Sequence, residues 1–353
     1  MLRPCLRLLK NKKKNAWKIV ATFLVLLVVY LEAAVYFLNR SLWPSLTCAV
    51  EPTNYHRVLL VADPQLLGEE TETWIARWDC DRFLSKTFKL ALEYVEPSMV
   101  IFLGDLFDEG STATDDEYER YHQRFKRIFR TADRFFASKT IYIPGDNDIG
   151  GENEDITPQK LNHFDKYFGL KPDVVSFHNV SFVKINYMLK SAPHPPSGSD
   201  KVLTILLSHM PLLGASSFFT EKVIRDMKPS LIISAHDHKA VHFVGDLETG
   251  ERTLIESMST DERSLSDSKW RFQSSKKHTN EILVPTCSYR MGVKETGYGV
   301  LLIDSKGDNV CYSVLWLPDR LYHLKIYFYV FLPVTALYLI MYFFGRNSLV
   351  RSQ

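Results

Sequence analysis

The sequence predicts an α/β protein in which two mixed β-sheets form a sandwich flanked by helices, with two further helices that cross a membrane. Three observations support this fold class. Strand-like and helix-like runs alternate between Pro52 and Leu317, two long apolar runs bracket that region, and five of the strand-like runs end in Asp or His. Strand–helix–strand order is typical of a parallel sheet, and the later strands predict a second, mixed sheet packed on it.

The two apolar runs extend from Trp17 to Leu38 and from Ile326 to Phe344. Each has about the 20 residues needed to cross the hydrocarbon core of a bilayer. We therefore expect transmembrane helices at residues 19–38 and 325–344. Glu32 would be costly at mid-membrane, but it lies toward the end of its run, where it can reach the interface or a polar partner.

A cleaved signal peptide is the alternative for the first run, with Ile19 to Leu31 as its apolar segment. The run does not stop there, because it resumes after Glu32 and continues to Leu38. A membrane span explains this length better than a cleavage site does.

Positive charge predicts the orientation of the chain. Only Arg40 closely follows the first run, whereas six basic residues and no acidic one precede it: Arg3, Arg7, Lys10, Lys12, Lys13 and Lys14. The N-terminus should therefore be cytoplasmic. If both runs span, residues 1–18 and 345–353 are cytoplasmic tails, and residues 45–321 form one lumenal domain.

The formal net charge of +2 argues against a general nucleic-acid binder. Four cysteines would lie in the lumenal domain, namely Cys48, Cys80, Cys287 and Cys311. They permit two disulfides in three pairings, and free buried thiols are an equal alternative. Asn179-Val180-Ser181 is a candidate glycosylation site on the lumenal side.

Apolar spacing predicts the individual elements of the domain. Helices are expected at 82–95, 115–129 and 157–168, the last with Thr157 as its N-cap and Pro158 at its first position. Polar composition predicts loops at 191–200 and 261–279. Nine segments are strand-like: Val58–Ala62, Met99–Leu103, Thr140–Ile143, Ser181–Asn186, Val202–Leu207, Leu231–Ser234, Ala240–Val244, Gly299–Ile303 and Val310–Trp316.

Polar side chains gather where these strands end, which is where α/β sheets bind ligands. The five strand-end motifs are Asp63-Pro64-Gln65, Gly104 to Asp108, Gly145 to Asp148, Ser208-His209 and Ala235 to His238. Carboxylate, amide and imidazole donors without a thiol suit Mn, Fe or Zn. His236 and His238 are two residues apart, so on an extended segment both would face neighbouring metals.

These motifs, in this order, resemble the calcineurin-like metallophosphoesterase superfamily, and the resemblance covers most of the lumenal region. The flanking residues and the two spans look like its membrane-bound branch, which remodels GPI anchors. The resemblance implies a metallophosphoesterase-type sandwich and a manganese-dependent enzyme of the endoplasmic reticulum or Golgi. That enzyme would remove ethanolamine phosphate from an anchor mannose.

The resemblance also implies roles for single residues. Asp63 and His238, with Gln65, would hold a first metal, and His209 and His236 would hold a second. Asp105 would bridge the two metals, and Asp108 would orient a histidine ligand. The resemblance implies that both ions are Mn²⁺, with Fe or Zn as alternatives. Two such ions polarise a phosphoryl group and activate water for in-line attack.

The chain departs from the family pattern at three places. Gln65 stands where many members have a metal-binding histidine. An ungapped alignment makes Asp146 a ligand of the second metal, with Asn147 in place of a catalytic histidine, whereas a shift of one residue makes Asn147 the ligand. Asn147 can donate a hydrogen bond but cannot transfer a proton at neutral pH. Ala235 replaces a glycine.

Two functions are compatible with these features. The first is an active phosphodiesterase acting on a lipid-linked or glycan-linked ester at the membrane that anchors it, with a GPI anchor as the expected substrate. The second is a catalytically inactive membrane protein that acts as a cargo adaptor, which Gln65 and Asn147 favour. The retained Asp and His residues favour the enzyme.

Overall fold

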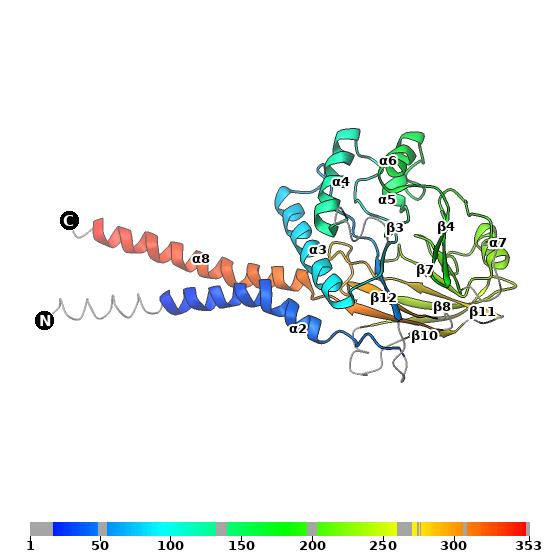
Figure 1. Cartoon of the computed structure of the whole chain (residues 1–353). Coiled ribbons are helices and arrows are strands. Elements are labelled where there is room, and N and C mark those ends of the chain that lie inside the picture. The colour runs from blue at the N-terminus through cyan, green and yellow to red at the C-terminus, as the bar shows by residue number, and fades with distance from the viewer. Residues whose placement is uncertain are drawn as a thin grey trace. The chain divides into compact units, whose positions relative to one another are not determined.

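The structure is a computed structural model that describes residues 17–48, 55–131, 140–195, 203–259, 270–273, 275, 277–305 and 309–350. The chain divides into two compact units, each considered by itself below. One unit is Leu42–Leu317, and the other comprises Met1–Ser41 together with Pro318–Gln353. Figure 1 shows the two sheets of the larger unit and the long helices of the smaller one.

The first sheet of the larger unit has six strands in the order β10-β13-β12-β1-β2-β3. Its parallel part is made of β1 (Tyr55–Val61), β2 (Met99–Phe102) and β3 (Thr140–Tyr142). This confirms the parallel sheet predicted for the first half of the chain. The antiparallel part is made of β12 (Gly297–Asp304), β13 (Asn309–Trp316) and β10 (Trp270–Gln273).

The second sheet is mixed and has seven strands in the order β4-β5-β6-β7-β11-β8-β9. The strands are β4 (Val174–Phe177), β5 (Val180–Lys184), β6 (Leu203–Leu207), β7 (Leu231–Ser234), β8 (Val241–Asp246), β9 (Arg252–Ser257) and β11 (His278–Leu283). The expected sandwich of two mixed sheets is confirmed. The last two strands, β12 and β13, extend the first sheet rather than the second, because β12 pairs directly with β1.

Three segments differ from the sequence-based expectation. Strands β4 and β9 lie outside the nine predicted strands. Residues 261–279 were expected to form a loop, but β10 and the start of β11 lie there, where the many polar residues hid the two strands. Residues 196–200 and 261–269, parts of the two expected loops, lie outside the described residues, as does Val202 at the start of an expected strand.

The larger unit also contains the helices α3 (Trp74–Val95), α4 (Asp115–Phe129), α5 (Asp146–Ile149), α6 (Pro158–Phe168) and α7 (Phe218–Met227). The bounds of α4 and α6 match the predicted helices, and Thr157 caps α6 as expected. Helix α3 begins eight residues earlier than predicted, because its first turns expose Trp74, Ile75 and Trp78 and so lack an apolar stripe that faces the core.

The main core lies between the two sheets and is formed by side chains from both, such as Leu60, Ile101, Ile205 and Ile233. A second core lies between α7 and the face of the second sheet that points away from the first sheet. There Val223 and Ile224 pack in one cluster with Leu206. The disulfide Cys48–Cys311 joins residues 263 positions apart, while Cys80 and Cys287 are buried free thiols. The structure thus selects one disulfide and two free thiols from the alternatives.

The smaller unit contains two helices that are long and apolar enough to cross a membrane, Trp17–Ser41 and Arg320–Met341. The first includes a π-helical turn, η1 (Tyr30–Ala34), followed by α2 (Val35–Ser41), and the second belongs to α8 (Arg320–Val350). Glu32 in η1 finds polar partners on α8. Its carboxylate accepts hydrogen bonds from Arg320 Nη1 and from the Tyr327 hydroxyl, both at 2.7 Å.

Candidate metal centre

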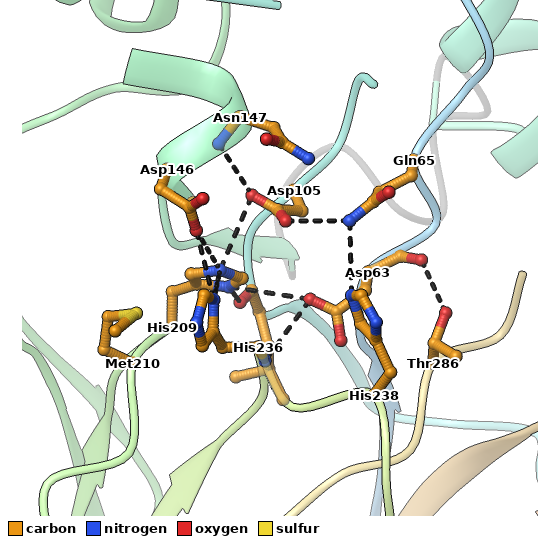
Figure 2. A network of polar contacts seen from close by, with 12 residues as sticks. Asp63, Gln65, Asp105, Asp146, Asn147, His209, Met210, His236, His238 and Thr286 are labelled. Carbon is orange, nitrogen blue, oxygen red and sulfur yellow. Dashed lines mark hydrogen bonds and ion pairs between the residues drawn. The ribbon is translucent and has the colours of Figure 1, made fainter. Parts of the chain in front are cut away.

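The five strand-end motifs converge at one edge of the sandwich. Asp63 and Gln65 follow β1, Asp105 follows β2, Asp146 follows β3, His209 follows β6, and His236 and His238 follow β7. The structure therefore brings all seven proposed ligands together, with carboxylates and imidazoles facing a common space (Figure 2). They come from both sheets, so the cluster straddles the sandwich.

Asp146, His209 and His236 form the first group of donors. Asp146 Oδ1 lies 3.0 Å from His209 Nε2 and 3.2 Å from His236 Nδ1. His209 Nδ1 lies 2.8 Å from the carbonyl oxygen of Leu103, which leaves Nε2 facing the cluster. A buried ligand histidine commonly donates its second nitrogen to a backbone carbonyl in this way.

This geometry bears on the choice between Asp146 and Asn147. The Asp146 carboxylate lies between the two histidines, whereas Asn147 meets the cluster through its backbone, whose N–H donates to Asp105 Oδ1 at 3.0 Å. Figure 2 shows the Asn147 side chain on the side of Asp105 away from His209. Asp146 is therefore the better candidate ligand.

Asp63, Asp105 and His209 form the second group of donors, and Gln65 and His238 lie beside it. Gln65 Nε2 donates to Asp105 Oδ2 at 2.9 Å and lies 3.3 Å from His238 Nε2. A half-turn of this amide would offer its oxygen to a cation instead. Asp63 Oδ2 is buried with no hydrogen-bond partner among the described residues. A buried carboxylate oxygen without a donor is costly, and a cation would satisfy it.

The backbone at these positions is strained. Five of the proposed ligands have a positive φ, at 45° for Asp63, 38° for Gln65, 48° for Asp105, 74° for His236 and 62° for His238. Residues other than glycine pay about 1–2 kcal/mol each for this conformation, which clusters at functional sites. The two histidines are thus placed by a bend, not by the extended segment expected from the sequence, and they face different parts of the cluster.

Gly145 is required at its position by close packing. A Cβ at this residue would lie 2.1 Å from Asp105 Oδ1 and 2.2 Å from the Asp105 nitrogen. Any larger residue would therefore push the β3 loop away from the proposed bridging carboxylate. The glycine is part of what holds two strand-end loops in contact.

Asp148 is a buried carboxylate that organises two of these loops. Its Oδ1 accepts the backbone N–H groups of Leu106 and Phe107 at 3.0 and 3.3 Å, and its Oδ2 accepts that of Gly145 at 2.9 Å. The sequence assigned an orienting role to Asp108. Within the described part of the chain, Asp108 makes no hydrogen bond to a histidine, so the orienting contacts come from Asp148 and the Leu103 carbonyl.

Glu281 on β11 is a second buried carboxylate that holds loops in place, and sequence reasoning missed it. Its carboxylate accepts the N–H groups of Leu212 and Leu213 at 2.7 and 2.6 Å, that of Gly214 at 3.3 Å, and the Ser234 hydroxyl at 2.8 Å. It thereby joins the loop after His209 to the end of β7, just before His236. Glu281 ends a polar run in β11, from His278 to Glu281, so no signal in the sequence indicates that this carboxylate is buried.

Glu152 was also missed. Its Oε1 lies 3.7 Å from His236 Nε2, on the opposite side of the ring from Asp146, and its side chain is 46% exposed. It follows Gly151 in a loop of three acidic residues, so the sequence offered only a polar segment. The contact adds a solvent-accessible carboxylate to the edge of the cluster.

The concentration of charge shifts the titration of these groups. Burial raises the pKa of Asp63 to about 8, and Asp105 adds to that rise. Burial alone would lower the pKa of His209, but Asp105, Asp146 and Asp63 raise it well above its usual value. Burial, His209 and His236 lower the pKa of His238 to about 4. Without a cation, protons must therefore neutralise part of the cluster at neutral pH.

Metal binding should consequently release protons. A cation competes with the protons held by Asp63 and His209, so the affinity for Mn²⁺ should rise with pH, by about tenfold per unit for each proton displaced. Isothermal titration of the full chain in detergent at pH 6 and pH 8, in buffers of different ionisation enthalpy, measures both quantities. Equal affinity at the two pH values with no proton release would contradict the assignment.

The donor set fits two divalent cations. Three carboxylates, three imidazoles and one amide suit borderline metals such as Mn²⁺, Fe²⁺ and Zn²⁺. Asp105 lies between the two groups, 3.5 Å from His209 Nε2 and hydrogen-bonded to Gln65 on the other side. The unpartnered Asp63 oxygen and the strained backbone both favour an ion-binding role over a merely structural one.

Comparison with known proteins agrees with this chemistry. The family model described as calcineurin-like phosphoesterase matches residues 56–240. The chain is 24% identical to cell division control protein 1 of Saccharomyces cerevisiae, over 94% of this chain and 76% of that protein. It is 25% identical to the Caenorhabditis elegans metallophosphoesterase 1 homolog, over 86% of each.

Metallophosphoesterase 1 of Danio rerio is 30% identical over 48% of this chain, and the matched part is 44% of that protein. Among solved structures, the metallophosphoesterase from Sphaerobacter thermophilus overlays with a TM-score of 0.38 at 9% identity, covering 75% of this chain and 89% of that one. The family match spans more than half of the sequence and includes Asp63, Asp105, Asp146, His209 and the His236–His238 pair. The chain therefore belongs to the calcineurin-like phosphoesterase family and is a metal-dependent phosphoesterase.

Proposed function

We propose that this phosphoesterase hydrolyses a phosphodiester on a membrane-linked glycan, namely the ethanolamine phosphate on a GPI-anchor mannose. The observation that supports hydrolysis is the cluster of Asp63, Asp105, Asp146, His209 and His236, in which one oxygen of Asp63 has no hydrogen-bond partner among the described residues. The substrate class is supported by the resemblance of the motifs to the GPI-remodelling branch and by two helices able to anchor the chain beside a lipid-linked ester.

Seven residues would hold the two ions. Asp63, Gln65, Asp105 and His238 would hold one ion, and Asp105, Asp146, His209 and His236 would hold the other. The family resemblance implies that both ions are Mn²⁺. Two ions so placed supply charge that polarises the phosphoryl oxygens and activates water. Leu103 and Asp148 keep the ligands oriented through the contacts described above.

Asn147 and Asp108 are the proposed catalytic residues beside the ions. Asn147 can donate hydrogen bonds to a phosphoryl oxygen but cannot transfer a proton at neutral pH. Burial raises the pKa of Asp108 to about 6, with Glu109 and Glu72 contributing. Asp108, which is not a proposed ligand, would then retain a proton in mildly acidic surroundings, and this suits protonation of a leaving alcohol.

Glu152 supports ethanolamine as the substituent on phosphorus. Its carboxylate lies at the rim of the cluster, 3.7 Å from His236, and is accessible to solvent. An ammonium group two carbons from a bound phosphoryl group could pair with a carboxylate in this position. Phosphodiesters whose substituent carries no positive charge would lack that contact.

The proposed location is the lumen of the endoplasmic reticulum or Golgi, with both termini in the cytoplasm. The excess of basic residues before Trp17, the disulfide Cys48–Cys311 and the exposed Asn179 of the glycosylation sequon support it. On this proposal residues 45–321 are the lumenal domain and residues 19–38 and 325–344 are the spans.

Hydrolysis by the full chain in detergent tests the proposal. With Mn²⁺, the protein should release ethanolamine phosphate from a mannose diester and should cleave a chromogenic phosphodiester. His236→Ala should reduce both rates by about 10³-fold or more, because a ligand of the second ion is lost. His194→Ala, at an exposed loop residue, is the matched control. Cleavage of chromogenic diesters alone would refute the ethanolamine substrate.

The alternative is a cargo adaptor without turnover, which Gln65 and Asn147 favour. Metal content separates the two functions, because an adaptor has no need for bound ions. Two tightly bound Mn, Fe or Zn ions per purified chain support the enzyme, and fewer than one supports the adaptor.

A further inference from the structure

A cavity of about 400 Å³ opens at the same edge of the sandwich as the proposed metal centre. Lys239, which directly follows His238, forms one wall, and Lys294 forms another. Because consecutive Cα atoms are about 3.8 Å apart, this wall begins next to a proposed ligand. The volume is in the range of sites that bind small molecules.

The strand register explains this placement. Lys239 leads into β8, whose first residue, Val241, pairs with Ser257 at the end of β9. Lys294 leads into β12, whose first residue, Gly297, pairs with Trp316 at the end of β13. Strand β12 also pairs antiparallel with β1, so its start lies beside the end of β1 that leads to Asp63.

Thr286 ties the cavity to the proposed metal centre. Its hydroxyl donates to the Asp63 carbonyl oxygen at 2.8 Å, and its N–H donates to the His238 carbonyl oxygen at 3.4 Å. Its own carbonyl accepts the Gly297 N–H at 2.9 Å, just past Lys294. Figure 2 shows Thr286 beside Asp63 and His238. Thr286 therefore links the start of β12, beside the cavity, to the backbone of two proposed ligands by hydrogen bonds.

The lining combines cationic and apolar groups. Within the described part of the chain, neither Lys239 nor Lys294 forms an ion pair or a hydrogen bond, and both side chains are exposed. Met258, Val293 and Trp316 supply an apolar surface. One carboxylate, Glu295, also lines the cavity and is engaged in an interaction of its own. The charge available to a ligand is therefore positive.

We propose that this cavity binds the alcohol portion of the substrate, specifically a sugar that carries a second phosphate group. This inference rests on the proposed function, since it places the scissile phosphodiester at the metal centre. The apolar wall would pack against the sugar ring, and the two lysines would pair with the second phosphate. The cavity would then select glycans with a second phosphate group over glycans that carry only the scissile phosphodiester.

Two matched substrates test the proposal on the full chain in detergent with Mn²⁺. They are ethanolamine phosphodiesters of mannose and of the same mannose carrying a phosphomonoester, and the rate at which ethanolamine phosphate is released is measured. The diester with the additional phosphate should have the lower KM. The double variant Lys239→Ala/Lys294→Ala should raise that KM about tenfold, given the modest strength of exposed charge pairs, and should change the KM of the diester without the additional phosphate by less than about twofold.

The double variant Lys222→Ala/Lys277→Ala is the control, because both residues are exposed and neither lines the cavity. Equal KM ratios in the wild type and the cavity variant, or the same loss in the control, would overturn the proposal. A second measurement does not depend on turnover. Broadening of the ³¹P signal of mannose 6-phosphate by the metal-free protein should disappear in the cavity variant alone.

These measurements separate two kinds of failure. If the wild type cleaves neither diester, the proposed function is wrong, while ³¹P broadening still decides whether the cavity binds the sugar phosphate. If both diesters are cleaved but the cavity variant behaves as the wild type does, only the cavity assignment is wrong.

Discussion

Asp105→Asn should nearly abolish turnover, by about 10³-fold or more, and should remove most of the bound metal. Asp105 lies between the two donor groups, where its carboxylate accepts the Asn147 N–H at 3.0 Å and the Gln65 amide at 2.9 Å. An amide cannot supply a shared negative charge, and its NH₂ would face one of these two donors. Metal content by mass spectrometry and the rate on a chromogenic diester measure the two losses.

The same substitution should not destabilise the metal-free protein. Burial and the nearby Asp146 raise the pKa of Asp105, so its ionised form is disfavoured in the fold. For a carboxyl whose pKa is raised on folding, stability falls as the pH rises from its unfolded pKa toward its folded pKa. Above that window Asp105→Asn should leave the metal-free melting temperature unchanged or higher, while the stabilisation by Mn²⁺ is lost.

Asp237→Asn is the matched control for this prediction. The same change is made between His236 and His238, but at an exposed side chain. It should retain metal and most of the activity. If Asp105→Asn instead binds two ions per chain and turns over at a rate near that of the wild type, Asp105 does not bridge the proposed ions.

Glu281→Ala should produce the largest loss of stability among single substitutions outside the ligand set. The change removes a fully buried carboxylate and leaves three backbone N–H groups and the Ser234 hydroxyl without an acceptor. Unsatisfied buried donors cost about 1–3 kcal/mol each, and partial relaxation should leave a net loss of roughly 3–5 kcal/mol. In a domain of this size that corresponds to a fall in Tm of about 10 °C.

The loss should also reach the proposed metal centre. Glu281 holds the loop that follows His209, so Glu281→Ala should weaken Mn²⁺ binding as well as the fold. Glu281→Gln keeps the shape but turns an NH₂ toward a donor, and its Tm should lie between those of the wild type and the alanine variant. Glu251→Ala, at an exposed residue, is the control. Tryptophan fluorescence during heating measures Tm, and a shift of less than about 2 °C in Glu281→Ala would refute this role.

Much of the fold is accessible from local patterns. Apolar runs such as Leu231–Ser234 and helical spacing such as 115–129 are properties of neighbouring residues, and the structure has these elements with the same bounds. The strand-end rule likewise singled out seven polar residues that the folded chain gathers in one place, because parallel strands end at a common edge. These inferences needed no knowledge of distant contacts.

Other features depend on contacts between residues far apart in the chain. The pairing of Cys48 with Cys311, the membership of β12 and β13 in the first sheet, and the preference for Asp146 over Asn147 each required the folded chain. The roles of Glu281 and Thr286 also required the folded chain. In the linear sequence both look like ordinary polar residues, and nothing there indicates their buried hydrogen bonds. The composition of the metal centre is thus encoded locally at strand ends, whereas the hydrogen bonds that hold its loops and the neighbouring cavity in place join residues far apart in the chain and form only when the chain folds.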